Sequence, residues 1–241
     1  MVSFTRKIKT ISLMKSPIII ALDMEIKSAL ELAKKIDPKV CKVKVGSELF
    51  TKGGPKVIEK LKDLGFDVFL DLKFHDIPNT VSRSVEAAIK LGVWMLNVHS
   101  LGGKEMLKAA YKTVENSSTK PLLIGVTVLT SLEDKDIKQI GLQKSTREQV
   151  LLLAQLCQDE RLDGVVCSPK ELSFLRESLD KDFVLVTPGI RSIKSKKDDQ
   201  LRTSTALEAF NNGADYIVIG REITNHKNPN EKIHQILKEF Q

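Results

Sequence analysis

The sequence predicts a single-domain α/β fold, the (β/α)8 TIM barrel. Three observations support this prediction. The chain has 241 residues, close to the usual length of one such barrel. Short runs rich in Val and Ile recur eight times, and an amphipathic stretch of helical length follows each run. Eight alternations of strand and helix favour a closed barrel over an open doubly wound sheet.

Each apolar run has the composition of a parallel strand that is buried on both faces. None approaches the roughly 20 apolar residues that a membrane-spanning helix needs, so we expect no membrane association. The predicted strands are residues 17–22, 40–45, 66–72, 93–98, 122–128, 164–167, 183–186 and 216–219.

The stretches between the runs are amphipathic and carry charged residues, as helices outside a barrel do. No linker rich in Pro, Gly or Ser divides the chain. We therefore expect a flexible N-terminal extension at residues 1–16 and one barrel domain over residues 17–241. The predicted helices are residues 26–36, 55–64, 80–91, 104–114, 147–159, 169–179, 204–211 and 229–240.

Composition indicates an ordinary globular protein, with 41% hydrophobic and 29% charged residues. The net charge of +7 could suggest a nucleic-acid partner, but Arg6, Lys7, Lys9 and Lys15 supply four of these charges before the first predicted strand. The remainder suits a pocket for an anionic phosphate and does not form the basic stripe of a nucleic-acid binder. We therefore expect no nucleic-acid partner.

The three cysteines are Cys41, Cys157 and Cys167, and they lack the spacing of metal ligands. Scattered cysteines in odd number are typical of reduced thiols in a cytosolic protein. We therefore expect a cytoplasmic protein.

Charged side chains end several of the apolar runs. Asp23 follows the first run, Lys44 ends the second, and Asp71 and Lys73 end the third. Catalytic groups of a TIM barrel project from these strand ends, and alternation of faces should bring Asp71 and Lys73 together inside the barrel. By the same alternation Lys42 should lie one layer deeper than Lys44, in a role that the sequence does not reveal. A purely structural ion-pair network is the alternative, but buried charges are costly, so a catalytic cluster is favoured.

The segment after the third run begins a helix. Pro78 suits the first helical position, which makes Ile77 the cap and leaves Asp76 outside the helix, free to face a site or a partner subunit. His75 and His99 could suggest metal ligands, but no convincing set of His and carboxylate ligands accompanies them. Structural histidines are the favoured interpretation, and no metal is expected.

Two loops near the end of the chain carry residues suited to phosphate. Loops after strands seven and eight of such barrels commonly bind phosphate through backbone N–H groups and a short helix N-terminus. Here the seventh run leads into Gly189 and Arg191, and the eighth into Gly220 and Arg221. Glycine lets the backbone approach the anion, and arginine binds it bidentately. The long connection at residues 188–202 is either a lid over the site or a solvated insertion.

Residues 71–80, Asp-Leu-Lys-Phe-His-Asp-Ile-Pro-Asn-Thr, resemble the signature of the orotidine 5′-phosphate decarboxylase family without a departure. The resemblance implies a homodimeric carboxy-lyase of pyrimidine biosynthesis that needs no cofactor and converts orotidine 5′-phosphate to uridine 5′-phosphate (UMP), the last step of de novo UMP synthesis. Further segments that carry the resemblance are residues 21–23, 44–46, 97–99, 126–131, 187–191, 198–200 and 219–221.

The resemblance also implies individual roles. Lys44, Asp71, Lys73 and Asp76 would form an alternating charged array, in which Lys73 protonates the C6 carbanion. Asp76 and Thr80 would reach into the neighbouring subunit's site. The implied substrate-binding residues are Asp23 and Lys44 at the ribose, Thr130 at the pyrimidine, Arg191, Gln200, Gly220 and Arg221 at the phosphate, and also Asn79 and Thr80.

Two alternatives stay open from the sequence. A metal-dependent sugar-phosphate decarboxylase or aldolase of the same barrel group shares the Asp-x-Lys-x-x-Asp core, but the intact segment 75–80 and Gln200 argue against it. Metal dependence would decide between the two. A non-catalytic nucleotide-binding or RNA-associated barrel would fit the positive charge, but it would have little use for the charged array.

Overall fold

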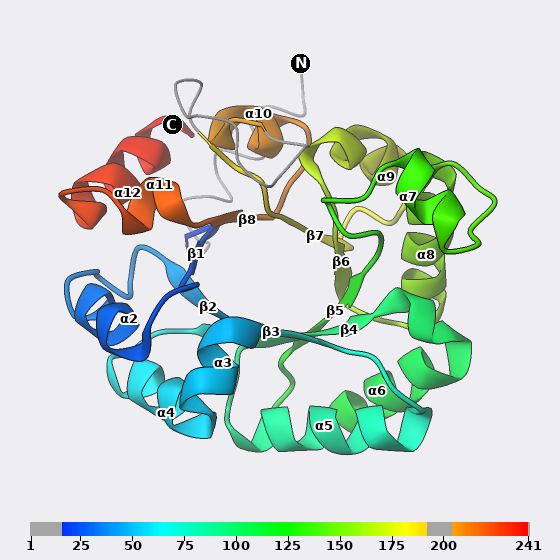
Figure 1. The fold of residues 1–241 in the computed structure, drawn as a ribbon, viewed down its shortest axis with the longest axis horizontal. Helices are drawn as coiled ribbons and strands as arrows, with labels where there is room; N and C mark the ends of the chain where they lie inside the picture. The colour runs from blue at the N-terminus through cyan, green and yellow to red at the C-terminus, as the bar shows by residue number, and fades with distance from the viewer. Residues whose placement is uncertain (1–15, 192–203, 241) are drawn as a thin grey trace.

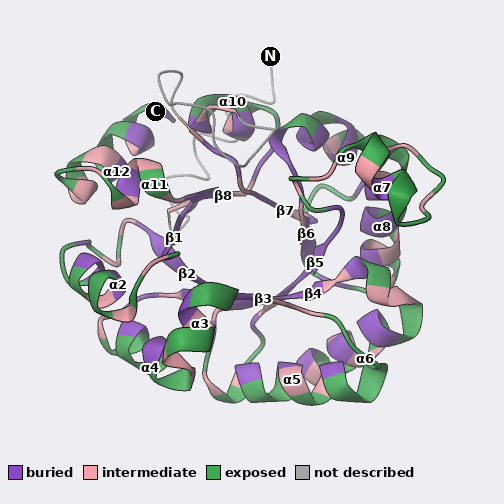
Figure 2. Ribbon diagram, viewed as in Figure 1, coloured by how far each residue is buried: buried purple, intermediate pink, exposed green. Residues whose placement is uncertain are grey.

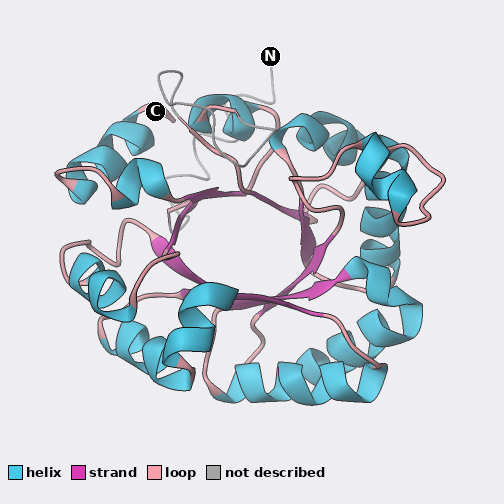
Figure 3. Cartoon of the chain, viewed as in Figure 1, coloured by secondary structure: helices cyan, strands magenta, loops and turns pink. Residues whose placement is uncertain are grey.

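The computed structural model describes residues 16–191 and 204–240. Eight parallel strands pair in chain order, and β8 closes the ring on β1. The predicted barrel is therefore confirmed (Figures 1 and 3). No helix within these two ranges is long and apolar enough to cross a membrane. Residues 1–15 of the predicted extension lie outside the described residues, so the division into residues 1–16 and 17–241 stays a prediction.

All eight strands lie on the predicted apolar runs, with small shifts at their ends. The largest shift is at β3, which begins and ends two residues later than predicted and so contains Lys73. The strands are β1 (Ile18–Ala21), β2 (Lys42–Gly46), β3 (Val68–Phe74), β4 (Met95–His99), β5 (Leu122–Val126), β6 (Gly164–Val166), β7 (Val184–Thr187) and β8 (Tyr216–Ile219).

Helices surround the barrel on its outside (Figure 1). The eight predicted positions all carry a helix. They are α2 (Ile26–Ala33), α4 (Pro55–Asp63), α5 (Pro78–Lys90), α6 (Gly103–Glu115), α8 (Thr146–Asp159), α9 (Leu172–Ser178), α10 (Ala206–Asn211) and α12 (Pro229–Lys238).

Five further helical segments accompany these. Four of them lie outside the predicted helices, because each is too short to show a helical period, and η2 is the first turn of the helix predicted at residues 169–179. Two are single 3₁₀ turns that lead directly into α6 and α9. The five segments are α3 (Ser47–Gly53), η1 (Ser100–Gly102), α7 (Asp134–Gln139), η2 (Pro169–Glu171) and α11 (Arg221–Thr224).

The core has two layers, one on each side of the strands. Ile18 and Ile20 of β1 belong to the large layer between the strands and the helices, whereas Ile19 faces the barrel interior with Phe69 and Met95. Figure 2 shows the strands and the inward sides of the helices as buried, and the outward sides of the helices as exposed. The alternation of side chains along each strand thus fills both layers.

Lys42 lies at the base of the barrel, deeper than Lys44, as predicted. Its residue is only 3% exposed. Its ammonium donates to the backbone oxygen of Ser16 at 2.7 Å and lies 5.0 and 5.3 Å from the ring centroids of Trp94 and Tyr216. The two rings attract the cation and pack against its stem. Lys42 therefore belongs to the base of the barrel and not to the mouth.

Strand β3 departs from regular pairing near its end. Leu70 pairs with Leu96 and Phe74 with Val98, so four residue steps on β3 oppose two on β4. Lys73 lies within this bulge and has a φ of 53°, a left-handed conformation that is uncommon for a residue other than glycine. Asp71 and Lys73 do lie together as predicted. Asp71 follows the regular alternation and pairs in register with Gly46, whereas the bulge places Lys73.

Substitution of Gly164 tests how closely β6 and β7 approach. A Cβ atom at Gly164 would lie 2.1 Å from the backbone oxygen of Val184, which the barrel holds in place. We expect Gly164→Ala to lower the free energy of unfolding by about 2–4 kcal/mol, measured by urea denaturation. Gly141→Ala is the control, because Gly141 has a positive φ but open space around it, and it should cost only about 1 kcal/mol. Equal losses would contradict the steric explanation.

Candidate active site

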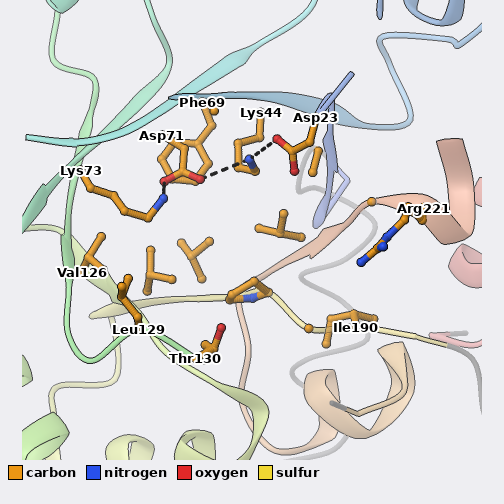
Figure 4. Close-up of a pocket in the computed structure, with 18 of the residues that line it drawn as sticks. Asp23, Lys44, Phe69, Asp71, Lys73, Val126, Leu129, Thr130, Ile190 and Arg221 are labelled. Atoms are coloured by element: carbon orange, nitrogen blue, oxygen red, sulfur yellow. Dashed lines mark hydrogen bonds and ion pairs between the residues drawn. The ribbon is translucent and has the colours of Figure 1, made fainter. Parts of the chain in front are cut away.

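A cavity of about 760 Å³ occupies the mouth of the barrel, at the carboxyl ends of the strands. This volume is typical of a small-molecule site. One wall is charged, whereas Phe69, Val126, Leu129 and Ile190 supply apolar surface (Figure 4). Eight of the predicted site residues line the cavity: Asp23, Lys44, Asp71, Lys73, Thr130, Arg191, Gly220 and Arg221.

Four charged side chains of alternating sign form a continuous row along one side of the cavity (Figure 4). The Nζ atom of Lys73 lies 2.6 Å from Oδ1 of Asp71. The Nζ atom of Lys44 lies 3.2 Å from Oδ2 of Asp71 and 3.0 Å from Oδ1 of Asp23. The row within one chain is therefore Asp23, Lys44, Asp71 and Lys73, and Asp23 takes an end position that was not predicted for it.

The electrostatics of the row depend on burial and on the alternation of sign. Burial disfavours a charged lysine, but the carboxylates of Asp71 and Asp23 together outweigh it and raise the pKa of Lys44. Burial likewise disfavours a charged carboxylate, yet Lys44 and Lys73, with hydrogen bonds from Lys73 and Asn97, lower the pKa of Asp71. Lys44 and Asp71 therefore both stay charged at neutral pH.

Among Lys44, Asp71 and Lys73, the side chain of Lys73 is the most accessible from the cavity. Its side chain is 35% exposed, against 12% for Asp71 and 10% for Lys44. An ammonium in this position has one side held by a carboxylate and the other open to a bound molecule. It can therefore stabilise negative charge on a ligand and donate a proton to it.

Asn97 of β4 binds two members of the row, Asp71 and Lys73. Reasoning from individual residues did not predict this role. Its Nδ2 donates to Oδ1 of Asp71 at 2.7 Å, and its Oδ1 accepts the backbone N–H of Lys73 at 2.8 Å. A signal was present in the sequence: Asn97 is a polar residue within an apolar run, two positions after Met95, and so on the interior face of the strand.

The opposite side of the cavity is formed by the loops after β7 and β8. Gly189, with a φ of 80°, and Arg191 follow β7, and the backbone N–H of Arg191 donates to Ser204 at 2.9 Å. Gly220 precedes α11, and Arg221 lies across the cavity from Lys73 (Figure 4). The predicted pair of arginine-bearing loops is thus brought together. Gln200, the other predicted residue of this region, lies outside the described residues.

The predicted residues Asp76, Asn79 and Thr80 do not line the cavity of their own chain. Residues 75–80 are all exposed, and Ile77 is 66% exposed. Helix α5 begins at Pro78 with Ile77 as its cap, as predicted, and Asp76 accepts the N–H of Ile77 at 2.6 Å. This segment therefore presents polar and apolar side chains on the surface beside the mouth.

His75 and His99 stack on each other, with ring centroids 5.2 Å apart. Burial, followed by the charges of His75 and Lys73, lowers the pKa of His99 to about 4. Its ring is therefore neutral at pH 7. Within residues 16–191 and 204–240, no group of three His, Cys, Asp or Glu residues is arranged to hold a metal ion.

Comparisons with known proteins agree on one family. Residues 16–236 match the model of the "Orotidine 5'-phosphate decarboxylase / HUMPS family". The chain is similar to orotidine 5′-phosphate decarboxylases of Saccharophagus degradans (49% identity over 224 residues, 92% of this chain and 94% of the relative) and Pasteurella multocida (53% over 225 residues, 92% and 97%). A crystal structure of orotidine 5′-phosphate decarboxylase from Lactobacillus acidophilus superposes with a TM-score of 0.83 at 38% identity, covering 93% of this chain and 99% of that one.

The lowered pKa of Asp71 predicts how stability changes with pH. The unfolded chain takes up a proton near the ordinary value of 3.8, whereas folded Asp71 resists protonation to lower pH. The stabilisation from this carboxylate is therefore present above about pH 5 and is lost as the pH falls through the folded pKa. We expect the stability of the unmodified chain relative to Asp71→Asn, measured by urea denaturation, to decrease between about pH 5 and pH 3.

Asp163 provides a control of opposite sign. Burial raises its pKa, so the folded chain binds this proton more readily than the unfolded chain does. The stability of the unmodified chain relative to Asp163→Asn should therefore increase as the pH falls over the same range. The same trend in both variants would contradict the electrostatic description of Asp71.

Proposed function

The chain belongs to the orotidine 5′-phosphate decarboxylase / HUMPS family, and we propose that its barrel mouth removes CO2 from orotidine 5′-phosphate with Lys73 as the proton donor. The overall activity follows from the relatives, which are about half identical over most of the chain and carry the decarboxylase name. The enzyme therefore converts orotidine 5′-phosphate to UMP in pyrimidine biosynthesis. The observation that supports the role of Lys73 is its ammonium, held by Asp71 and open to the cavity.

The reaction requires a site that tolerates a carbanion. When the bond between C6 and the carboxylate breaks, its electron pair stays on C6 of the pyrimidine, where no adjacent group accepts it. The ammonium of Lys73 stabilises this charge and then transfers a proton to C6, which gives UMP. The neutral amine regains its proton from water, so no oxidant, reductant or metal takes part in the proposed step.

Asp71 and Lys44 keep the ammonium of Lys73 in position. Asp71 holds the Lys73 ammonium at 2.6 Å, and Lys44 neutralises Asp71 from the other side at 3.2 Å. Without the positive charge of Lys44, burial would raise the pKa of Asp71 and disfavour its ionised form. We assign Asp23 and Lys44 a second role as hydrogen-bonding partners of the ribose hydroxyls, since both border the cavity.

The phosphate is assigned to the side of the cavity away from Lys73. Arg191 and Arg221 supply guanidinium groups. Gly220, the residue that caps the N-terminus of α11, lines the cavity beside them. Gln200 is a further proposed phosphate ligand, and Thr130 is proposed to bind the pyrimidine. Binding energy gained at the phosphate, far from C6, can then contribute to the chemical step and not only to affinity.

A homodimer is proposed, with Asp76 and Thr80 completing the partner's site and Asn79 beside them. These residues are exposed and do not line their own cavity, and the exposed Ile77 between them would be covered in a dimer. The row of charges in one chain ends at Lys73, so Asp76 of the partner subunit would extend the alternation by one negative charge. We further propose a cytoplasmic enzyme, consistent with three buried free cysteines.

Activity in the presence of EDTA tests both the function and the role of Lys73. We expect the unmodified enzyme to convert orotidine 5′-phosphate to UMP with excess EDTA, followed by the change in pyrimidine absorbance. Lys73→Ala should lose about 10³-fold or more in kcat, because it removes both the proton donor and the stabilising charge.

Lys90→Ala is the matched control, since Lys90 is an exposed lysine that pairs with Glu86 on the outer helix α5. Its kcat should stay within about twofold. A folded protein that is inactive with EDTA, but active on a sugar phosphate once magnesium is added, would contradict the proposal and indicate the metal-dependent alternative.

Complementation between two inactive variants tests the shared site. Lys73→Ala and Asp76→Ala should each be inactive alone. If Asp76 acts in the partner's site, each mixed dimer has one site with both residues intact, and random assembly gives about a quarter of normal activity. The variants can be mixed by joint refolding, and sedimentation confirms the dimer. Activity no greater than that of the separate variants would show that Asp76 does not act across an interface.

A further inference from the structure

We propose that Asn97 is a positioning residue for the proton donor, holding the backbone of Lys73 and the carboxylate that binds its ammonium with one amide group. The inference deepens the proposed function and rests on it. Asn97 does not line the cavity, so it would act through Lys73 and Asp71 and not by touching the substrate.

The two hydrogen bonds of Asn97 connect both ends of the Lys73 residue. Its Oδ1 accepts the backbone N–H of Lys73 at 2.8 Å. Its Nδ2 donates at 2.7 Å to Oδ1 of Asp71, the same oxygen that lies 2.6 Å from the Lys73 ammonium. One rigid amide thus fixes where the lysine side chain begins and where it ends.

An amide is required here because it both accepts and donates. Lys73 presents an N–H, which needs an acceptor, and ionised Asp71 presents an oxygen, which needs a donor. A carboxylate at position 97 could meet only the first need, and an apolar side chain neither. These partners also determine which end of the amide is oxygen and which is nitrogen.

The bulge in β3 explains why a side chain performs this task. Between the pairs of Leu70 with Leu96 and of Phe74 with Val98, β3 has two residues more than β4. The backbone of Lys73 departs from the regular pairing with β4, with a φ of 53°. The side chain of Asn97 replaces the backbone partner that regular pairing would have supplied. It therefore holds an uncommon conformation at the residue whose placement the chemistry needs.

Asn97 is fully buried, so its amide is also shielded from competing water. Hydrogen bonds in such surroundings are stronger than exposed ones and hold geometry more tightly. A shift of the ammonium by about 1 Å is enough to change a rate by about 100-fold. The effect of losing Asn97 should therefore appear in kcat more than in the binding of the nucleotide.

The experiment compares Asn97→Leu with the unmodified enzyme in two measurements: kcat for orotidine 5′-phosphate, and the inhibition constant of UMP. UMP has the same ribose, phosphate and ring, and so reports on the integrity of the rest of the site. We expect kcat to fall by about 10- to 100-fold while the inhibition constant changes less than about threefold. Asn97→Ser, which keeps a small polar group, should show the same division.

Ser100→Ala is the matched control for the loss of a buried hydrogen bond near the end of β4. Ser100 is fully buried and contacts Sγ of Cys157 at 3.0 Å, away from the cavity. Its kcat should remain within about threefold. A similar fall in kcat for Ser100→Ala would show general damage to β4 and would overturn the proposal.

Several other results would contradict the positioning role of Asn97. A folded Asn97→Leu enzyme with kcat within threefold of normal would overturn the positioning role and leave the proposed function standing. Parallel losses of kcat and UMP binding, or failure of both Asn97 variants to fold while Ser100→Ala folds, would make Asn97 a structural residue only. Inactivity of the unmodified enzyme would overturn the proposed function and this inference with it.

Discussion

The carboxylate of Asp71 is the interaction on which the site depends. It is almost buried, and it contacts the ammonium of Lys73, the ammonium of Lys44 and the amide of Asn97. A buried carboxylate without such partners is costly and would take up a proton. Each partner in turn is held by the same carboxylate. The four side chains therefore form one unit, in which Lys44, Lys73 and Asn97 keep the buried Asp71 ionised.

The closed barrel explains how separate segments supply this unit. Strands β2, β3 and β4 are neighbours in the ring and supply Lys44, Asp71, Lys73 and Asn97, whereas Asp23 follows the adjacent strand β1. Strands β7 and β8 end on the facing arc and bring Arg191 and Arg221 to the other side of the cavity. The width of the barrel thus separates Lys73, proposed to react with the pyrimidine, from Arg191 and Arg221, proposed to bind the phosphate. A nucleotide whose phosphate lies far from its reacting carbon requires such a separation.

The sequence predicted most of this arrangement because two signals were strong. Periodic apolar runs located all eight strands, and charges that interrupt those runs located Lys44, Asp71 and Lys73. The position of Asn97 was missed because a single amide within an apolar run has many structural explanations. The bulge was missed because nothing in local composition marks a change of pairing between two strands, and pairing is decided by the neighbour. For Asn79 and Thr80 only the family resemblance gave a role, and for Asp76 the sequence indicated a position outside the helix but not which site it serves, because the site proposed for these residues belongs to another subunit.

The filled base of the barrel limits how substrate and products enter and leave the cavity. Lys42 with Trp94 and Tyr216 occupies the base, and side chains such as Phe69 and Met95, each no more than 1% exposed, fill the interior beneath the cavity. Along the described strands the cavity therefore has an outlet only at its mouth. The CO2 that the reaction releases therefore leaves through the same mouth by which the nucleotide enters. Substrate and product nucleotide also use this opening, so the product must dissociate before the next substrate can bind.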